Sequence, residues 1–272
     1  MTEKIMETNN DQNRFERLME IMRKLRAPGG CPWDAEQSHD SLKRYLLEEA
    51  YEVIEAIDTG DRAHLKEELG DLLLQPVFHA AIAEENGDFT IDDILDAINE
   101  KLIRRHPHVF GDEVIESSEA QVKNWEKIKT QEKGVQRKSA LSGVPPHLPA
   151  LMQAQKITEK AAGVGFDWES TDQVYAKVME ELHEFEEAML SGGQEEMESE
   201  LGDLLFAIVN LGRFLTIDPE DALRKTIRRF TKRFSHVEDA LHARGQAMRN
   251  STLEEMDLLW EEAKKLEKQG IN

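Results

Sequence analysis

Residues 68–73 read Glu-Leu-Gly-Asp-Leu-Leu, and residues 200–205 repeat the same six residues. The repeat extends beyond this motif, because the pattern Glu-Glu-x-x-Glu at 48–52 returns at 180–184, at the same distance ahead of the second motif. Chance does not reproduce so many positions in register. The sequence therefore indicates two copies of one structural unit.

The length of the chain agrees with a duplication, since 272 residues can form two domains of ordinary size, each with its own core. We expect a disordered lead-in at 1–12, a first domain at 13–131, a linker at 132–149 and a second domain at 150–272. The linker is predicted from its three prolines and two glycines.

Composition narrows the class of protein. A formal net charge of −21 argues against nucleic acid as a partner, because phosphate backbones bind basic surfaces. The sequence has no apolar run long enough to span a bilayer, and Met1–Asn13 does not have the pattern of a secretory signal. The single cysteine, Cys31, fits a reducing compartment. We expect a cytoplasmic protein that binds no membrane.

Apolar residues recur at helical spacing through most of the chain, which predicts an all-α fold. A loop is predicted around Trp33 and Asp34, because two prolines and two glycines precede or flank it. The helices predicted in the first copy are Asn13–Leu25, Ser41–Asp58, His64–Glu85 and one from Thr90 to about Arg105, and those in the second are Thr171–Leu190, Gln194–Leu215 and one from Pro219 to about Asp239.

The repeated acids fall on neighbouring helices. Glu181 and Glu184 are expected at the edge of an apolar stripe that contains Leu182 and Met189. The Gly-rich turn Ser191–Gly193 allows the next helix to pack antiparallel, so that acids from both helices converge. Such an all-oxygen group suits Mg²⁺ or Mn²⁺. An ordinary solvated face is the alternative for any single pair, but the duplication favours a metal site. The converging acids are Glu181, Glu184, Glu200 and Asp203, and in the first copy Glu49, Glu52, Glu68 and Asp71.

Cations and tryptophans repeat after the acids. Two cations one helical turn apart can bind a polyphosphate together, and a tryptophan can stack on a base. A solvated basic face and tryptophans that anchor a core are the alternatives. The residues are Lys101, Arg105, Trp125 and Lys129 in the first copy, and Arg229, Arg233, Trp260 and Lys264 in the second.

Three further motifs complete a resemblance. Gly-Gly-Cys-Pro-Trp-Asp stands at 29–34, Arg-Arg-His-Pro-His-Val-Phe at 104–110 and Gly-Phe-Asp-Trp at 165–168. Together with the repeated acids they make the chain, from Phe15 to Lys265, resemble the two-domain MazG family. The resemblance implies two tandem helical domains, built on helix pairs that pack into four-helix-bundle-like assemblies. It also implies Mg²⁺-dependent hydrolysis of nucleoside triphosphates to a monophosphate and pyrophosphate.

The resemblance implies a role for each matched residue. The eight acids would be metal ligands, Glu180 would orient or deprotonate water, and Arg229 and Arg233 would stabilise developing charge. Tyr45 stands where the second copy has Lys177, although Lys43 and Arg44 are close, and Arg229 stands where the family pattern has Lys. We therefore expect the second copy to dominate catalysis. The residues implied to contact nucleotide are Lys177, Arg229, Arg233, Trp260, Lys264, Lys101, Arg105, Trp125 and Lys129.

Two other classes of protein, and two quaternary arrangements, are compatible with some of these residues. A di-iron carboxylate bundle needs Glu-x-x-His on two helices, and Glu180–His183 supplies one, but the first copy has Tyr51 at the histidine position. A non-catalytic helical scaffold gives no reason for convergent acids. Exposed apolar stripes predict a homodimer, with pairing of the two copies inside one chain as the alternative; sedimentation distinguishes the two.

Overall fold

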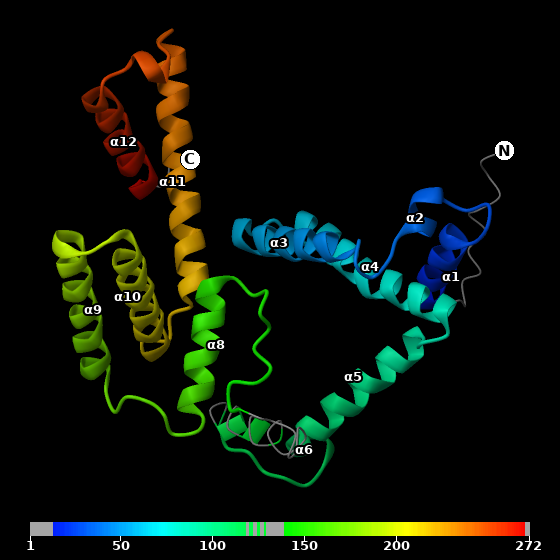
Figure 1. The fold of residues 1–272 in the computed structure, drawn as a ribbon. Helices are drawn as coiled ribbons and strands as arrows, with labels where there is room; N and C mark the ends of the chain where they lie inside the picture. The colour runs from blue at the N-terminus through cyan, green and yellow to red at the C-terminus, as the bar shows by residue number, and fades with distance from the viewer. Residues whose placement is uncertain (1–12, 118–119, 122–123, 126–127, 129–138, 270–272) are drawn as a thin grey trace. The chain divides into compact units, whose positions relative to one another are not determined.

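The computed structural model describes residues 13–117, 120–121, 124–125, 128 and 139–269. Every regular element in these residues is a helix (Figure 1), so the prediction of an all-α fold is confirmed. The chain divides into two compact units, Met1–Lys133 and Gly134–Asn272. Within the described residues, no helix combines the length and the apolar character that crossing a membrane requires.

The first unit is built on the antiparallel pair of α3 and α4, with α1 packed against α4. Gly60 ends α3 in the left-handed region at φ +72°, and the side chain of Asp61 then accepts hydrogen bonds from the backbone N–H groups of Ala63 and His64 at the start of α4. These caps reverse the chain sharply between the two acidic motifs. The helices are α1 Arg14–Arg26, α2 Pro32–Glu36, α3 Lys43–Thr59, α4 Arg62–Asn86, α5 Ile91–Arg105 and α6 Pro107–Phe110.

One prediction in this unit is wrong. The stretch around Trp33 and Asp34 is the short helix α2, because Pro32 occupies the first helical turn, where its missing N–H costs no hydrogen bond. The core of the unit lies between α1 and α4. Its buried residues are Met19, Met22, Leu42, Val77, Phe78, Ala80, Ala81, Ile82 and Ile91.

The second unit is built on the pair of α9 and α10, with α8 packed on α10 and with α11 paired to α12. Gly192 and Gly193 form the short connection between α9 and α10. The elements are α8 Ala150–Ala162, α9 Thr171–Ser191, α10 Gln194–Phe214, α11 Pro219–Ala243, the 3₁₀ turn Met248–Asn250 and α12 Leu253–Lys268.

The face of α9 that packs inward differs from the predicted stripe. The buried residues are Val174, Glu181 and Ala188, which recur every seven residues. Leu182 and Met189 are instead 36% and 54% exposed. Glu181 therefore lies in the middle of the packed face of α9, and not at its edge as the sequence predicts.

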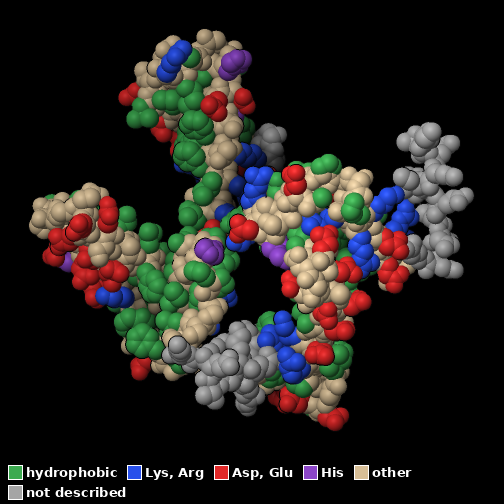
Figure 2. Space-filling view, turned by 45° about the vertical axis from the view of Figure 1, so that its right-hand side comes forward, with side chains coloured by type: hydrophobic (Ala, Val, Ile, Leu, Met, Phe, Trp, Pro, Cys, Tyr) green, Lys and Arg blue, Asp and Glu red, His purple; other side chains and the backbone are tan. Residues whose placement is uncertain are grey.

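Apolar side chains also reach the surface of the second unit (Figure 2). On α10, Leu201, Leu205 and Ile208 are each nearly half exposed, whereas Val209 is buried within the unit. These exposed residues agree with the stripe that motivates the expected homodimer, which stays a prediction.

Candidate active site

Three acids meet between α9 and α10. Oxygen atoms of Glu181, Glu184 and Glu200 all lie within 4.8 Å of one another. Glu181 is only 7% exposed, so its carboxylate is largely removed from water. Asp203, the fourth predicted ligand, lies outside this group but lines the adjacent cavity together with Glu181.

The first unit repeats the arrangement between α3 and α4. Oxygen atoms of Glu49, Glu68 and Asp71 lie within 4.8 Å of one another, and Glu68 is 9% exposed. Glu52 lies close enough to Glu49 to share a hydrogen bond and to raise its pKa. All four predicted ligands of this unit therefore interact as one group.

Crowding of like charges perturbs both acidic groups. The pKa of Glu49 is raised by burial and then by the charges of Asp71, Glu52 and Glu68. The pKa of Glu184 is raised by desolvation and then by the charge of Glu181. Carboxylates that repel one another in this way are stabilised by a cation, and oxygen donors without nitrogen or sulfur suit a hard divalent ion. The donor sets of both units fit Mg²⁺.

Lys177 lies beside the acids of the second unit and forms ion pairs with two glutamates. Its Nζ lies 2.7 Å from Glu180 and 2.7 Å from Glu181. Hydrogen bonds to Glu180 and Glu181 raise the pKa of Lys177, so the ammonium stays charged. The structure thus places this predicted phosphate ligand beside the predicted metal ligands.

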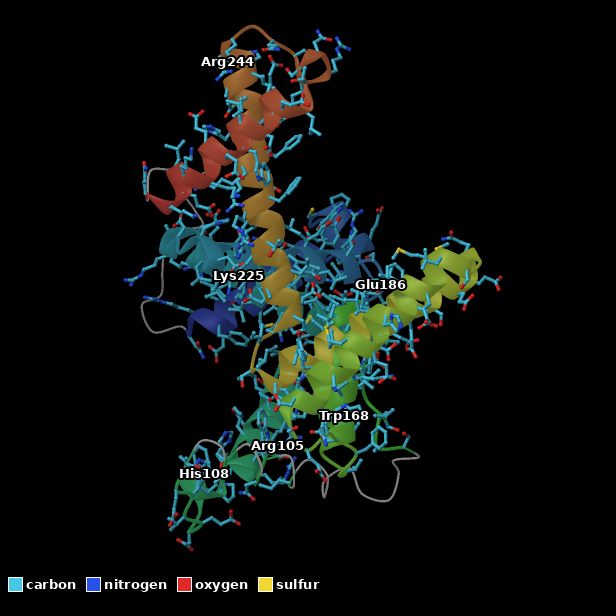
Figure 3. All side chains as sticks on the ribbon, turned by 90° about the vertical axis from the view of Figure 1, so that its left-hand side faces the viewer. Arg105, His108, Trp168, Glu186, Lys225 and Arg244 are labelled. Carbon is cyan, nitrogen blue, oxygen red and sulfur yellow. The ribbon has the colours of Figure 1, made fainter. Side chains whose placement is uncertain are left out.

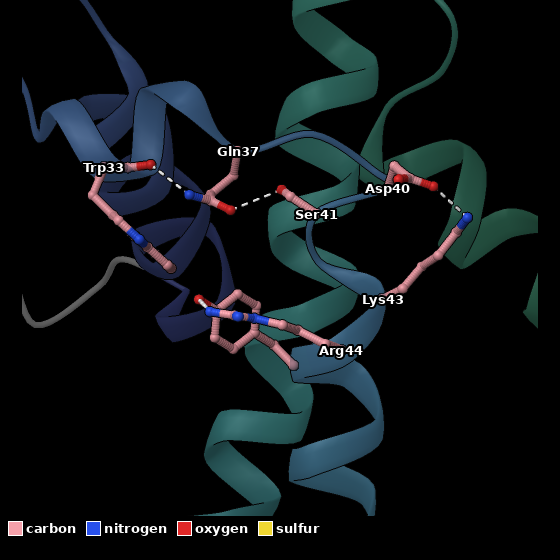
Figure 4. A pocket seen from close by; sticks show the side chains of 7 residues that line it. Trp33, Gln37, Asp40, Ser41, Lys43 and Arg44 are labelled. Atoms are coloured by element: carbon pink, nitrogen blue, oxygen red, sulfur yellow. Dashed lines mark hydrogen bonds and ion pairs between the residues drawn. The ribbon is translucent and has the colours of Figure 1, made fainter.

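Tyr45, at the matching position of the first unit, packs among aromatic residues. Its ring lies 5.7 Å from that of Trp33, and the Arg44 guanidinium lies 4.4 Å from the centre of the tyrosine ring. Lys43 forms an ion pair with Asp40 (Figure 4), so the two nearby cations interact with Asp40 and Tyr45, whereas Lys177 interacts with a predicted metal ligand. These residues line an open surface pocket.

A histidine that the sequence reasoning missed lies beside the acids of the first unit. Nε2 of His64 lies 2.9 Å from Oε1 of Glu68, one helical turn away on α4. The spacing His-x-x-x-Glu was a usable signal, because residues four apart on a helix face each other. In the second unit this position is Glu196, so the nitrogen-bearing side chains beside the two acidic groups, His64 and Lys177, come from non-equivalent helices, α4 and α9.

The predicted nucleotide ligands after the acids form a separate group on α11 and α12. Nε of Arg233 donates to Glu267 at 2.9 Å, and its guanidinium lies 5.7 Å from the ring centre of Trp260. Lys264 donates to Glu261 at 2.6 Å, and Arg229 donates to Thr226 at 3.1 Å. These hydrogen-bond partners all lie on α11 and α12, and none of them is one of the acids on α9 and α10.

The matching residues of the first unit are only partly described. Lys101 and Arg105 lie on α5, and Arg105 is its last residue (Figure 3). Trp125 is 40% exposed. Lys129 lies outside the described residues.

A cavity of about 570 Å³ opens beside the acids of the second unit. It lies against α8, α9, α10 and the loop from α8 to α9 that carries Trp168 (Figure 3). Its lining includes Lys177, Glu181 and Asp203, and also Asn210 and Arg213, which lie further along α10. The sequence reasoning missed Asn210 and Arg213, because the repeat gives no signal there: the first copy has Phe78 and Ala81.

Known proteins match both units. The family model of the MazG nucleotide pyrophosphohydrolase domain matches residues 37–110 and 169–238, which contain all eight predicted metal ligands. A nucleoside triphosphate pyrophosphohydrolase/pyrophosphatase MazG from Thermotoga maritima is 52% identical over 250 residues, covering 92% of this chain and 95% of that protein. A nucleoside triphosphate pyrophosphohydrolase from Escherichia coli is 46% identical over 261 residues, covering 94% of this chain and 98% of that protein.

Both acidic helix pairs thus fall within matched MazG domains, and relatives of this similarity extend over nearly the whole chain. The chain belongs to the MazG nucleotide pyrophosphohydrolase family of hydrolases.

Proposed function

We propose that this protein hydrolyses nucleoside triphosphates to nucleoside monophosphate and pyrophosphate, that it depends on Mg²⁺ with Mn²⁺ as a substitute, and that its second unit dominates catalysis. The observation that carries the proposal is the meeting of Glu181, Glu184 and Glu200 beside the cavity that Asp203 and Lys177 also line. The names of the relatives from Thermotoga maritima and Escherichia coli support the reaction class.

The metal would be held by the acids. Glu181, Glu184 and Glu200 would supply ligands, with Asp203 as the fourth. Mg²⁺ bound there supplies positive charge for phosphate oxygens and lowers the pKa of a bound water. In the first unit, Glu49, Glu52, Glu68 and Asp71 form a group of the same composition, so we expect it to bind a metal as well.

The remaining residues would act on the substrate itself. Water attacks the α-phosphorus, the bond from that phosphorus to the bridging oxygen breaks, and pyrophosphate leaves with the bonding electron pair. Glu180 is exposed and hydrogen-bonded to Lys177, and we assign to it the acceptance of the proton from the attacking water. Lys177 lines the cavity as a charged ammonium and would bind phosphate oxygens.

Arg229 and Arg233 would stabilise the charge that develops on pyrophosphate, with Lys264 and Trp260 completing the substrate contacts. Arg233 now binds Glu267, so it would exchange this carboxylate for a phosphate. Such an exchange replaces one charge-assisted hydrogen bond by another. It requires α11 and α12 to meet the substrate that is held by α9 and α10.

The dominance of the second unit rests on a local difference. Lys177 offers a charged donor beside the acids, whereas Tyr45 is packed against Trp33 and Arg44. The first unit could then bind metal and nucleotide with a slower reaction.

The rival functions find less support. His183, the histidine that a di-iron site would use, is 70% exposed in its side chain and lies nearest to Glu186 and Glu187. It is therefore not directed at the group of Glu181, Glu184 and Glu200. A scaffold gives no account of acids gathered around one buried carboxylate in each unit, because like charges held together without a cation repel one another.

A panel of nucleoside triphosphates with Mg²⁺, scored separately for pyrophosphate and orthophosphate, tests the proposal. We expect pyrophosphate as the first product, and we expect Glu200→Gln to reduce the rate by roughly a hundredfold, because a ligand charge is lost while the helix is kept. The matched control is Glu198→Gln, whose exposed side chain on the same helix is bonded to Gln194. Early release of orthophosphate, or equal activity of the two variants, would contradict the proposal.

A further inference from the structure

Two histidines of the first unit contact each other away from the acids. His39 lies in the segment between α2 and α3, and His79 lies on α4, more than two helical turns beyond Asp71. Their Nδ1 atoms are 2.7 Å apart, their ring centres are 5.0 Å apart and their ring planes are within 8° of parallel. The ring centres are farther apart than the nitrogens by the sum of the two ring radii. The two rings therefore lie in one plane, and their Nδ1 atoms point directly at each other.

This geometry determines how many protons the pair can hold. A neutral imidazole has one nitrogen that donates a hydrogen bond and one that accepts, so one proton between the two Nδ1 atoms makes the contact attractive. The contact is kept when both rings are neutral, and also when one charged ring donates to a neutral one. When both rings are charged, two N–H groups point at each other and the contact must break. The two nitrogens face each other and not a shared third point, so they do not form a chelating pair for a tetrahedral or octahedral metal ion.

The surroundings of His79 do not compensate a positive charge on the pair. Burial and then the charge of His39 lower the pKa of His79, whereas a carboxylate close to the ring would raise it. The residues three and four positions away on α4 are uncharged. They are Gln75, Pro76, Ile82 and Ala83. Charged groups of the elements that pack on α4 have other partners. These are Arg23 with Glu84 and Arg26 with Glu85 from α1, Lys43 with Asp40 and Arg44 with Tyr45 at the start of α3, and Asp93 with Thr90 on α5.

The contact attaches the segment 37–42 to α4. In this segment Oγ of Ser41 donates to Oε1 of Gln37 at 2.8 Å, and Nε2 of Gln37 donates to the carbonyl oxygen of Trp33 at 2.9 Å (Figure 4). The same segment lines an open pocket of about 470 Å³ together with Trp33. His39 is exposed, so protons reach the pair from water. Release of His39 would therefore loosen the segment and change the surroundings of Trp33.

We propose that His39 and His79 form a proton-sensitive switch, which holds the segment 37–42 on α4 while the pair carries at most one positive charge and releases it when both rings are protonated. Folding disfavours the charged form of His79. The contact is therefore complete above pH 6.5, the ordinary pKa of this side chain, and is lost as the pH falls through the lower pKa of the folded state. The second unit has Thr171 and Leu211 at the matching positions, so the switch belongs to the first unit.

The wild type is compared with His39→Asn and His39→Leu to test the switch. The asparagine keeps a hydrogen-bonding group near the position of Nδ1 but takes up no proton, whereas leucine removes the hydrogen bond. The indole resonance of Trp33 is followed by NMR in the full-length proteins from about pH 8 to about pH 5, and Trp33→Phe identifies it among the four tryptophans. We expect the wild-type resonance to shift as the pH falls and His39→Asn to stay at the position seen at high pH. His39→Leu should stay at the position that the wild type approaches at low pH.

The nitrogen resonances of the imidazole rings give a second readout. His39 and His79 of the wild type should take up their protons in two separate steps, whereas His147, which is exposed in the second unit, takes up its proton in one step and is the control. A single shared step for the pair would overturn the proposal. So would a Trp33 resonance that does not shift in the wild type, or one that shifts equally in His39→Asn, because other groups would then cause the change. Both readouts compare the wild type with His39→Asn, so they remain decisive if His39→Leu does not fold.

Discussion

The two units contain the same acids but surround them differently. In the first unit Glu68 is paired with His64 from its own helix, and in the second Glu181 is paired with Lys177 from its own helix. Phe78 fills the interior of the first unit where the second has a cavity. The duplication has kept the acids in register while the surrounding residues have diverged. The acidic group and its surroundings therefore vary independently between the two units.

The two units use arginines from different helices to bind the segment that precedes the first acidic helix. In the first unit Arg26 on α1 binds Glu85 on α4 and donates to the carbonyl groups of Asp34 and Gln37. In the second unit the arginine is Arg213, on α10, and it binds the loop after α8. An arginine on α10 can also orient Asn210 on the same helix, which an arginine on the first helix of the unit would not do.

The largest expected difference between the units is catalytic. We expect Glu181→Gln to lower the rate of pyrophosphate release by on the order of a hundredfold, because the buried ligand of the dominant site loses its charge. Glu49→Gln, the matched change in the first unit, should lower it less than about threefold. The rates are measured on one triphosphate at saturating Mg²⁺, with folding verified by circular dichroism. Equal losses, or a larger loss from Glu49→Gln, would remove the asymmetry.

A smaller loss of activity should follow when Lys177, which lies beside the acids, is replaced by the residue at the matching position of the first unit. Lys177→Tyr gives the second unit the residue of the first, and we expect kcat/KM to fall roughly tenfold, because a charged donor to phosphate is lost. Tyr45→Phe serves as control in the first unit, where the hydroxyl is bonded to Arg44, and should leave the rate unchanged. A variant Lys177→Tyr as active as the wild type would show that this lysine does not account for the difference.

The smallest effect concerns stability and pH. A hydrogen bond from Arg213 is the main cause that holds the pKa of Asp167 below its ordinary value of 3.8. The ionised form is therefore favoured by folding, so its contribution is fully present above pH 3.8 and is lost as pH falls through the lower pKa of the folded state. Because both side chains are mostly shielded, we expect Asp167→Asn to lower the free energy of unfolding by about 1 kcal/mol at pH 7.

Urea denaturation of the wild type and Asp167→Asn at pH 7 and at acid pH measures this contribution. The difference between the two proteins should shrink as the pH is lowered. A difference that stays constant would mean that the ionised carboxylate of Asp167 contributes no pH-dependent stability.

Much of the fold could be predicted because its signals are local. The seven predicted helices match observed ones to within a few residues, and the caps at Gly60 and Asp61 are formed by residues with strong preferences for those positions. The helices α2, α6, α8 and α12 were not among the predicted helices; α2 and α6 have too few residues for a periodic pattern.

Part of the candidate site could be predicted because the spacing of its acids along each helix is also a local signal. The spacing of the acids placed Glu181 and Glu184 on one side of one helix and Glu200 on the next. It did not reveal that Glu181 lies at the centre of the packed face. In the sequence, an apolar stripe interrupted by one acid has the same pattern as an apolar stripe with the acid at its edge. His64 was missed, although its spacing from Glu68 was visible, because the second copy has Glu196 at the matching position and the repeat therefore did not mark it.

The sequence by itself determined the helical class, the duplication and the register of the acids, because a helix brings residues three and four apart onto one face whatever the surroundings. Only the tertiary structure decided that the second unit has a cavity and that His39 contacts His79. A cavity is the volume left over by side chains from several helices and a loop, far apart in the chain, and the contact of the histidines joins a loop to a helix 40 residues away. Neither has a local pattern, so both required the packed arrangement of these segments to be known.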